Sequence, residues 1–280
     1  MARKENQVVL ITGCSSGIGR ELAKEFAADG HLIVATARRL ESIEDLAGDG
    51  THILELDVTD EDSITTAVME ALALCGRIDI VVNNSGYALI GPVAELDTGD
   101  LRTQFETNVV GVFAVIRAVV PQMVERRSGR IVNIGSVSGV TATPFGGAYC
   151  GTKAAVHLMS DALRMELAPL GIRVITVQPG AVESRFGARA AHGIERYRDG
   201  SIYSKVFDSI EARAGASQEG WMPTAKFARH VVDAVTAPSP PAVFRAGKHS
   251  VRLPLLAHLP AVLRDRIFSK RFGLDRLLVG

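Results

Sequence analysis

Short apolar runs rich in Val and Ile alternate along the chain with longer segments whose apolar positions recur at helical spacing. Such runs, bounded by turn residues, are typical of strands buried on both faces, and they occur at QVVLIT, HLIVATA, HILEL, DIVVNN, RIVNIG, IRVITVQ and AVFRA. The segments between them predict helices over Ile18–Asp29, Leu40–Ala47, Asp60–Leu74, Leu101–Arg127 and Ala148–Leu170. This alternation predicts a single α/β domain over residues 1–280, with a doubly wound parallel sheet and helices on both faces.

Two segments depart from this regular order. The stretch from about 184 to 223 is rich in glycine and aromatic residues, and a long insertion in a compact domain is usually a lid or binding loop. Its aromatic side chains either offer apolar area to a bulky ligand or pack the lid onto the sheet. They are Phe186, Tyr197, Tyr203, Phe207 and Trp221.

The second departure is the tail from about 245 to 280, in which eight Lys/Arg and two Asp give a net charge of +6 among Leu, Val and Phe residues. A basic, leucine-rich segment can rest on an anionic membrane surface, or it can cover an edge of the domain with its charges in water. We favour the second interpretation, because no further anchoring signal accompanies the tail.

Composition excludes several classes of function. With 31 Lys+Arg, 31 Asp+Glu and a pI near 7.1, the chain has no overall field that would attract nucleic acid. The apolar run Val8–Ile11 is too short for a secretory signal, and no run predicts a transmembrane span. Three widely spaced cysteines, and histidines without ligand spacing, indicate a reduced, cytoplasmic protein without a metal site.

The sequence GCSSGIG at 13–19 lies between the first predicted strand and the first predicted helix. Glycines there allow a sharp turn and a close approach to a ligand, and the free N–H groups of a helix start attract a pyrophosphate. This placement favours dinucleotide binding in a Rossmann fold over a plain connection. The loop residues expected to contact the cofactor are Gly13, Ser15, Ser16, Gly17, Ile18 and Gly19.

The end of the second strand indicates which dinucleotide binds. An acid at this position commonly accepts hydrogen bonds from the ribose hydroxyls of NAD(H), but this chain has Ala37 followed by Arg38 and Arg39. A guanidinium suits the 2′-phosphate that distinguishes NADP(H) from NAD(H). We therefore expect NADP(H) as the cofactor, with Arg38 as the contact to this phosphate. The alternative is that both arginines only solvate the start of a helix.

Tyr149 and Lys153 are four residues apart on a predicted helix and therefore share one face. A nearby ammonium, together with an oxidised nicotinamide, should lower the pKa of the tyrosine toward neutrality, where a proton donor and acceptor works best. Ser136 ends a predicted strand, and strand ends meet helix starts at the edge where open α/β folds bind ligands. Its hydroxyl is therefore expected to hold a substrate oxygen beside Tyr149.

Several ordered motifs together resemble the short-chain dehydrogenase/reductase family over roughly residues 7–185: TGCSSGIG, the Asp57-Val58 pair, NNSG at 83–86, Asn108, Ser136, YCGTK and PGAVES at 179–184. The resemblance implies that Tyr149 is the general acid–base and that Lys153 lowers its pKa and holds the ribose hydroxyls. It also implies that Ser136 orients the substrate carbonyl, and that Asn108 holds a water linking the lysine to solvent.

The same resemblance implies further cofactor contacts. Asp57 and Val58 match the pair that recognises adenine, and Asn83 and Gly86 belong to the turn beside the adenosine ribose. The segment that begins with Pro179 and Gly180 matches the one that orients the nicotinamide, with Val182 as a backbone contact. Ser184 stands where threonine is commoner and keeps the hydroxyl.

By analogy within the family, the chain length and tail favour a hydrophobic alcohol or ketone as substrate, such as a steroid, retinoid or aryl ketone. Two alternatives remain: an idle NADP(H)-binding redox sensor, which has no need of the four catalytic residues, and a 3-oxoacyl thioester reductase, which favours a shorter lid. Family members also bury helix surfaces between subunits, so a homodimer or homotetramer is expected. One predicted helix carries an apolar stripe that fits either such an interface or the core of the subunit: Val156, Met159, Leu163 and Leu167.

Overall fold

The computed structural model describes residues 6–183, 190, 193–215 and 221–278, and its centre is a parallel sheet of seven strands in the order β3-β2-β1-β4-β5-β6-β7. All seven predicted strands are confirmed. They are β1 (Val8–Ile11), β2 (Leu32–Ala37), β3 (Thr51–Glu55), β4 (Ile80–Asn83), β5 (Gly129–Ile134), β6 (Ile172–Pro179) and β7 (Val243–Ala246). Because the chain returns from β3 to pair β4 with β1, the strand order reverses beside β1, where folds of this kind bind ligands.

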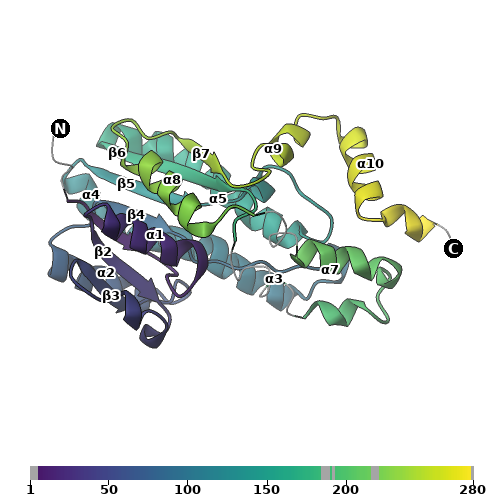
Figure 1. The fold of residues 1–280 in the computed structure, drawn as a ribbon, viewed down its shortest axis with the longest axis horizontal. Coiled ribbons are helices and arrows are strands. Elements are labelled where there is room, and N and C mark those ends of the chain that lie inside the picture. Colours follow the sequence, from purple (N-terminus) through teal and green to yellow (C-terminus); the bar gives the residue numbers. More distant parts are fainter. Residues whose placement is uncertain (1–5, 184–189, 191–192, 216–220, 279–280) are drawn as a thin grey trace.

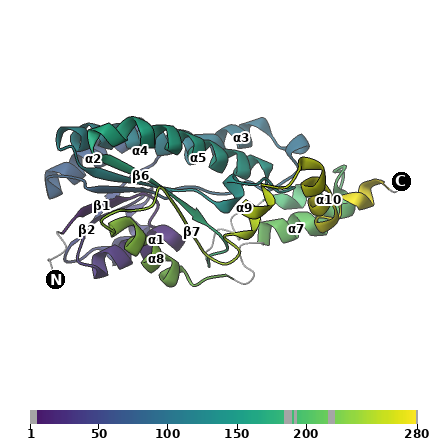
Figure 2. The ribbon, with the colours of Figure 1, turned by 90° about the horizontal axis from the view of Figure 1, so that it is seen from above.

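Helices cover both faces of the sheet, as predicted (Figures 1 and 2). One face carries α1 (Gly17–Ala28) and α8 (Thr224–Thr236), and the other carries α2 (Glu61–Cys75), α4 (Gly111–Glu125) and α5 (Gly147–Leu167). Each layer has its own apolar core: Phe26 and Phe227 are fully buried in the first, and Val115 and Met123 in the second. The sheet therefore holds its carboxyl edge rigidly between two packed layers.

A third apolar cluster lies beyond the carboxyl ends of the strands, where Figure 1 shows α7 (Phe207–Gly215) and α10 (Ala261–Arg271) extending from the sheet. Phe268 and Phe272 of the tail are buried there, and the ring of Phe272 lies edge-on to that of Phe145, 6.1 Å between centroids. The tail, which also includes α9 (Arg252–Leu256), thus packs on the active-site end of the domain. Membrane contact by its outer face stays the less favoured interpretation.

Two expectations about helices are wrong. The segment Leu40–Ala47 forms two short 3-10 turns, Leu40–Ser42 and Glu44–Leu46, because Ile43 between them has a non-helical φ of −134°. The second wrong expectation is that no run is long and apolar enough to cross a bilayer, since the helical stretch Thr98–Glu125 meets both conditions. It includes α3 (Thr98–Phe105) and α4, and α4 lies on the sheet in the second core. We therefore interpret the stretch as a core helix.

Candidate active site

The loop after β1 has the geometry of a phosphate cradle. Gly13 and Gly17 have positive φ values of +75° and +62°, which side chains rarely adopt. A methyl group at Gly19 would collide with the Asn84 side chain, whose Nδ2 donates to the carbonyl oxygens of Thr12, at 2.9 Å, and Gly13, at 3.1 Å. Asn84 thus ties the turn after β4 to the loop, a role that the sequence did not indicate because it depends on a contact across 72 residues.

A cleft of about 770 Å³ opens at this loop, between Ser15, Ser16 and Gly17 on one side and Glu183 and Thr224 on the other. Ser16 is the N-cap of α1, yet its side chain makes no capping hydrogen bond, and the first turn contains no acidic residue. The N–H groups at this helix start are therefore directed at the cleft without a side-chain acceptor, which suits a pyrophosphate. The residues present fit a dinucleotide cofactor.

The other predicted adenosine contacts lie along the same edge. Arg38 is exposed directly after β2. Asp57 follows β3, and its Oδ1 accepts hydrogen bonds from the backbone N–H and the hydroxyl of Thr59, while Val58 is buried. Asn83 instead directs its side chain into the sheet, where Nδ2 donates to Asn133 Oδ1 at 2.9 Å. Asn83 could therefore contact a cofactor only through its backbone groups.

The segment from Pro179 to Val182 is enclosed by chain from two later regions. Ala181 pairs with Lys248 and Val182 with Met222 in isolated bridges. A side chain at Gly180 would collide with the carbonyl oxygen of Lys248, which explains a glycine at this position. The predicted nicotinamide segment is thus fixed in place up to Glu183, whereas Ser184 and Phe186 lie outside the described residues.

The structure brings together Ser136, Tyr149 and Lys153. Ser136 follows β5, the other two lie four residues apart on α5, and all three are buried. Tyr149 is hydrogen-bonded to Ser136, and Lys153 Nζ lies 5.9 Å from the centroid of the Tyr149 ring. Lys153 also donates to the carbonyl oxygen of Ile134 at 2.7 Å, which holds the ammonium beside the strand end.

The fall in the tyrosine pKa that is expected beside Lys153 and a bound nicotinamide does not occur in the protein alone. Burial raises the pKa of Tyr149 to about 12, against lowering by the hydrogen bond with Ser136 and the positive charge of Arg213. Burial also lowers the pKa of Lys153 to about 8. In the protein alone, the cation that lowers the phenol pKa is Arg213, which lies on α7 of the lid.

Asn108 lies in a π-helical turn, Glu106–Val110, between α3 and α4. π-Turns within helices occur frequently at functional sites. The Asn108 amide exchanges two hydrogen bonds with the backbone of Tyr87, at 2.8 and 3.0 Å, and it donates to Thr152 Oγ1 at 3.2 Å. A Cβ at Gly86 would lie 3.0 Å from Asn108 Oδ1 and 3.8 Å from Lys153 Nζ, so Gly86 keeps the space between them open.

His157 lies beside the site, and the sequence analysis did not identify it. Its Nε2 accepts the backbone N–H of Ser136 at 3.3 Å, and methyl groups at Gly135 or Gly139 would collide with its ring. Behind it, Nδ1 lies 3.5 Å from Gln178 Nε2. The imidazole thus supports the strand end that carries Ser136, one helical turn beyond Lys153.

This arrangement predicts an acid-sensitive stability. Burial, with the positive charges of Lys153 and Arg245, lowers the pKa of His157 to about 4, although Asp161 opposes this. The unfolded chain takes up this proton near pH 6.5, so it binds more protons than the folded chain between pH 6.5 and 4. The unfolding free energy should therefore fall by on the order of 3 kcal/mol across this window.

Urea unfolding at several pH values checks this prediction, with the difference between wild type and His157→Gln isolating the one group. His52→Gln, which alters a partly exposed histidine on β3, is the control and should keep the slope of the wild type. An unchanged acid slope in His157→Gln would contradict the assignment.

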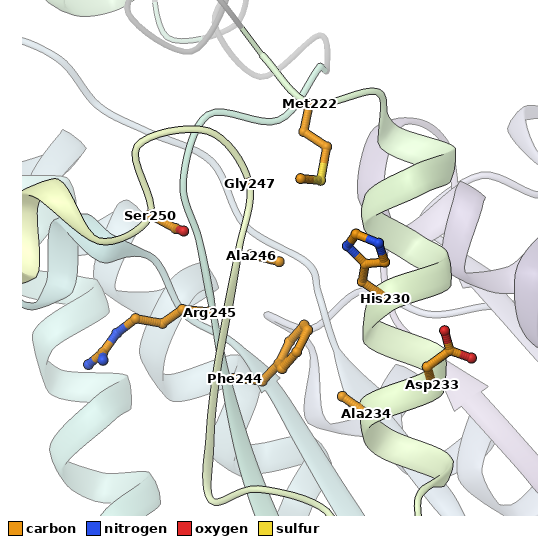
Figure 3. Close-up of a pocket in the computed structure, with 9 residues that line it drawn as sticks. All are labelled: Met222, His230, Asp233, Ala234, Phe244, Arg245, Ala246, Gly247 and Ser250. Carbon is orange, nitrogen blue, oxygen red and sulfur yellow. The ribbon is translucent and has the colours of Figure 1, made fainter.

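A second hollow, of about 620 Å³, lies between α8 and β7 (Figure 3) and contains none of the predicted site residues. Met222, His230 and Phe244 contribute to its lining. Figure 3 shows Arg245 on the other side of β7 from His230, and its Nε donates to Gln178 Oε1 at 2.7 Å. Arg245 thus lines this hollow and also belongs to the supporting network behind Ser136.

The aromatic residues of the lid were expected either to pack it onto the domain or to offer apolar area to a ligand, and the described ones differ in this respect. Tyr197 and Phe207 are buried in the third cluster together with Tyr149, and Tyr203 lies edge-on to Phe145 at 5.8 Å. These three pack the lid onto the domain, whereas Trp221 is 42% exposed. Because Phe145 and Tyr149 belong to the same cluster, the packed lid also forms an apolar surround for the reacting phenol.

A doubly wound sheet with a phosphate cradle beside β1 and a Ser–Tyr–Lys group beside β5 defines an NAD(P)-dependent oxidoreductase. A sequence profile described as short chain dehydrogenase matches residues 7–194. The chain belongs to the short-chain dehydrogenase/reductase family, whose members act on CH–OH groups with a nicotinamide cofactor. The family expectation from the sequence is confirmed.

Three similar proteins illustrate the match. A short-chain dehydrogenase from Streptomyces avermitilis has a crystal structure that superposes with a TM-score of 0.80 at 32% identity, covering 97% of this chain and 98% of that one. A dehydrogenase/reductase SDR family member 7B from Xenopus tropicalis is 34% identical over 77% of this chain and 72% of its own. An NADP-dependent 3-hydroxy acid dehydrogenase from Schizosaccharomyces pombe is 35% identical over 71% and 80%, respectively.

Proposed function

We propose that this protein transfers a hydride between NADP(H) and a hydrophobic alcohol or ketone. The observation that carries the proposal is the placement of Tyr149, which is hydrogen-bonded to Ser136 and is also a member of the apolar third cluster. One side of the phenol thus meets the polar group that would hold a carbonyl oxygen. The other side meets apolar side chains that favour a hydrophobic substrate.

The chain supplies positioning and proton transfer, while the nicotinamide supplies the hydride chemistry when bound. Ser136 would hold the substrate oxygen, and Tyr149 would give it a proton during reduction or remove one during oxidation. Lys153, fixed by Ile134, would hold the cofactor ribose and stabilise the phenolate by its charge. Asn108, through the open space at Gly86, would connect the ammonium to solvent.

The NADP(H) preference rests on the exposed Arg38 at the end of β2, where the adenosine ribose of a bound cofactor would lie. The NADP dependence stated for the fission yeast relative supports the same preference. A guanidinium that contacts a phosphate contributes more than a neutral hydrogen bond, whereas an acid at this position would repel the phosphate.

Arg38→Asp should therefore raise the KM for NADPH by about ten- to hundredfold and lower that for NADH, since a hydrogen bond to a charged group is worth about 1.5–3 kcal/mol. Steady-state kinetics with each cofactor at saturating carbonyl substrate measures both effects. Arg39→Asp is the matched control, because it places the same charge one residue further on. A larger effect from Arg39→Asp would move the contact to that residue, and unchanged KM values in both variants would contradict the preference.

A substrate panel tests the function itself. Purified protein is supplied with steroids, retinoids, aryl ketones and β-oxoacyl thioesters, and the consumption of NADPH and NADH is followed separately. Turnover of apolar ketones supports the proposal, and exclusive turnover of thioesters supports the 3-oxoacyl alternative. Tight NADPH binding without turnover of any carbonyl would favour the redox sensor.

The Schizosaccharomyces pombe relative introduces a second substrate class for the same chemistry, because its name specifies a 3-hydroxy acid. A hydroxy acid differs from a simple hydrophobic alcohol in carrying a carboxylate. This class therefore belongs in the panel, and it requires a positive group near the reacting carbon.

A homodimer or homotetramer and a cytoplasmic location stay predictions. The apolar stripe on α5 is divided: Val156 and Leu167 are buried in the core, while Met159 is 44% exposed. Its neighbours Leu158 and Met165 are 72% and 65% exposed. This apolar surface on α5 supports assembly through the helix, because exposed apolar patches commonly mark interaction sites.

A further inference from the structure

Arg213 extends from the lid helix α7 toward the start of α5. Its Nε donates to Thr143 Oγ1 at 2.9 Å. A Cβ built on Gly146 would lie 2.7 Å from Nη2 and 2.9 Å from Nε, so the guanidinium lies directly against the backbone just before α5 begins. Gly146 is three residues ahead of Tyr149. The lid thus places a positive charge at the approach to the reacting phenol.

Three other arginines of the lid and tail have acidic partners. Arg196 pairs with Asp100 at 3.0 Å, Arg198 with Glu195 at 2.7 Å, and Arg276 with Asp208 at 2.8 Å. Within the described ranges, no carboxylate lies within ion-pair distance of Arg213, although its side chain is partly buried. Partly buried charges in proteins are usually paired, because removing a charge from water is costly.

The surroundings of Arg213 also connect it to the substrate site. Its neighbours on α7, Ile210 and Ala214, are buried in the same apolar cluster as Phe145 and Tyr149. Its charge is felt at the Tyr149 hydroxyl, whose pKa it lowers. The Arg213 guanidinium thus has no carboxylate partner among the described residues, acts on the Tyr149 hydroxyl and lies next to apolar side chains.

We propose that Arg213 binds a carboxylate of the substrate, so that the substrate is an oxo or hydroxy acid with an apolar remainder. The inference rests on the proposed function and narrows its substrate class. A guanidinium presents N–H donors in a planar fork that suits a carboxylate. Nε is already used by Thr143, which fixes the orientation of the fork and leaves its terminal nitrogens for the ligand.

The reaction balance is unaffected by this contact. In reduction, the carbonyl carbon receives a hydride, and thus two electrons, from the reduced nicotinamide, while its oxygen receives a proton from the Tyr149 hydroxyl. The carboxylate neither gains nor loses a bond; it is held by Arg213 and orients the carbonyl. The phenolate that remains on Tyr149 regains its proton from solvent.

The test compares an acid with its neutral ester. Benzoylformate and methyl benzoylformate carry the same aryl ketone, and they are reduced with NADPH by wild type and by Arg213→Gln. We expect the variant to lower kcat/KM for the acid by about ten- to hundredfold relative to the ester, as for loss of one charged hydrogen bond. The ratio of acid to ester is the decisive readout, because it cancels any change in the tyrosine pKa that both substrates share.

Three controls make the outcome decisive. Arg198→Gln removes an exposed lid arginine that pairs with Glu195, and it should leave the ratio unchanged. Arg213→Lys keeps the charge and should restore part of the preference for the acid. β-Phenyl-β-hydroxypropanoate and its methyl ester, oxidised with NADP⁺, repeat the comparison with the carboxylate one carbon further away.

The two proposals fail in different ways. If wild type reduces the ester but shows no preference for either acid, or if Arg213→Gln keeps the preference, Arg213 has only its structural contact with Thr143 and the inference is wrong. Reduction of the ester by the wild type would then still support the proposed function. If neither acid, ester nor any other carbonyl is turned over, the proposed function itself is overturned. NADPH binding, followed by fluorescence, confirms that each variant is folded.

Discussion

Replacing Tyr149 by phenylalanine should lower kcat by about 10²- to 10⁴-fold, because general acid–base catalysis contributes on this scale. The change removes one oxygen, and the ring should keep its place in the apolar cluster with Phe145 and Tyr197. The affinity for NADPH should therefore change little. Single-turnover reduction of an aryl ketone measures the first effect, and fluorescence titration with NADPH measures the second.

Tyr203→Phe is the matched control, because Tyr203 lies in the lid with its ring against Phe145, near the same cluster. This variant also loses one phenolic hydroxyl and should keep kcat close to that of wild type. Full activity in Tyr149→Phe would contradict the assignment of the acid–base. Equal losses in both variants would indicate a disturbed pocket rather than a missing proton donor.

Gly171→Ala should destabilise the fold strongly. Gly171 follows the short turn after α5 and leads into β6 with a φ of +81°. An alanine in this conformation lowers the unfolding free energy by about 1–2 kcal/mol. The added methyl would also collide with the carbonyl oxygen of Arg127 and approach its carbonyl carbon to 2.9 Å. Because backbone cannot rotate away as a side chain does, we expect a total loss of about 2–5 kcal/mol in unfolding free energy, as for overpacking added to strain.

Gly76→Ala separates the two causes. Gly76 ends α2 with a φ of +75°, and a methyl there would meet no atom within 4 Å. This variant should lose only about 1–2 kcal/mol, the cost of the backbone conformation alone. Urea unfolding of both variants gives the comparison, and equal losses would show that the collision at Gly171 relaxes without cost.

The sequence was sufficient to predict the sheet and much of the site, because that information is local. Each strand is a continuous apolar run, and each motif lies at a strand end that the parallel order brings to one edge. The helix predicted over Leu40–Ala47 was wrong for an equally local reason, since Ser42 bonds back to the Arg39 carbonyl at 2.6 Å in a turn. Propensity alone did not indicate this competing contact.

Site features that were missed depend on long-range contacts. Asn84 stabilises a loop 71 residues earlier in the chain, and Arg213 contacts Thr143 across 70 residues. His157 was visible on the catalytic helix, but only the fold reveals that it accepts the Ser136 N–H. Burial raises the pKa of Tyr149 in the protein alone, and this effect cannot be read from the spacing of Tyr149 and Lys153.

The family profile ends at residue 194, whereas Phe268 and Phe272, which pack in the same cluster as Tyr149, come from the last part of the chain. The reaction and the substrate preference that we propose would thereby depend on different parts of the chain. Substitutions of Phe268 or Phe272 would then change the apolar surroundings of Tyr149 while the strands that carry the site motifs stay the same.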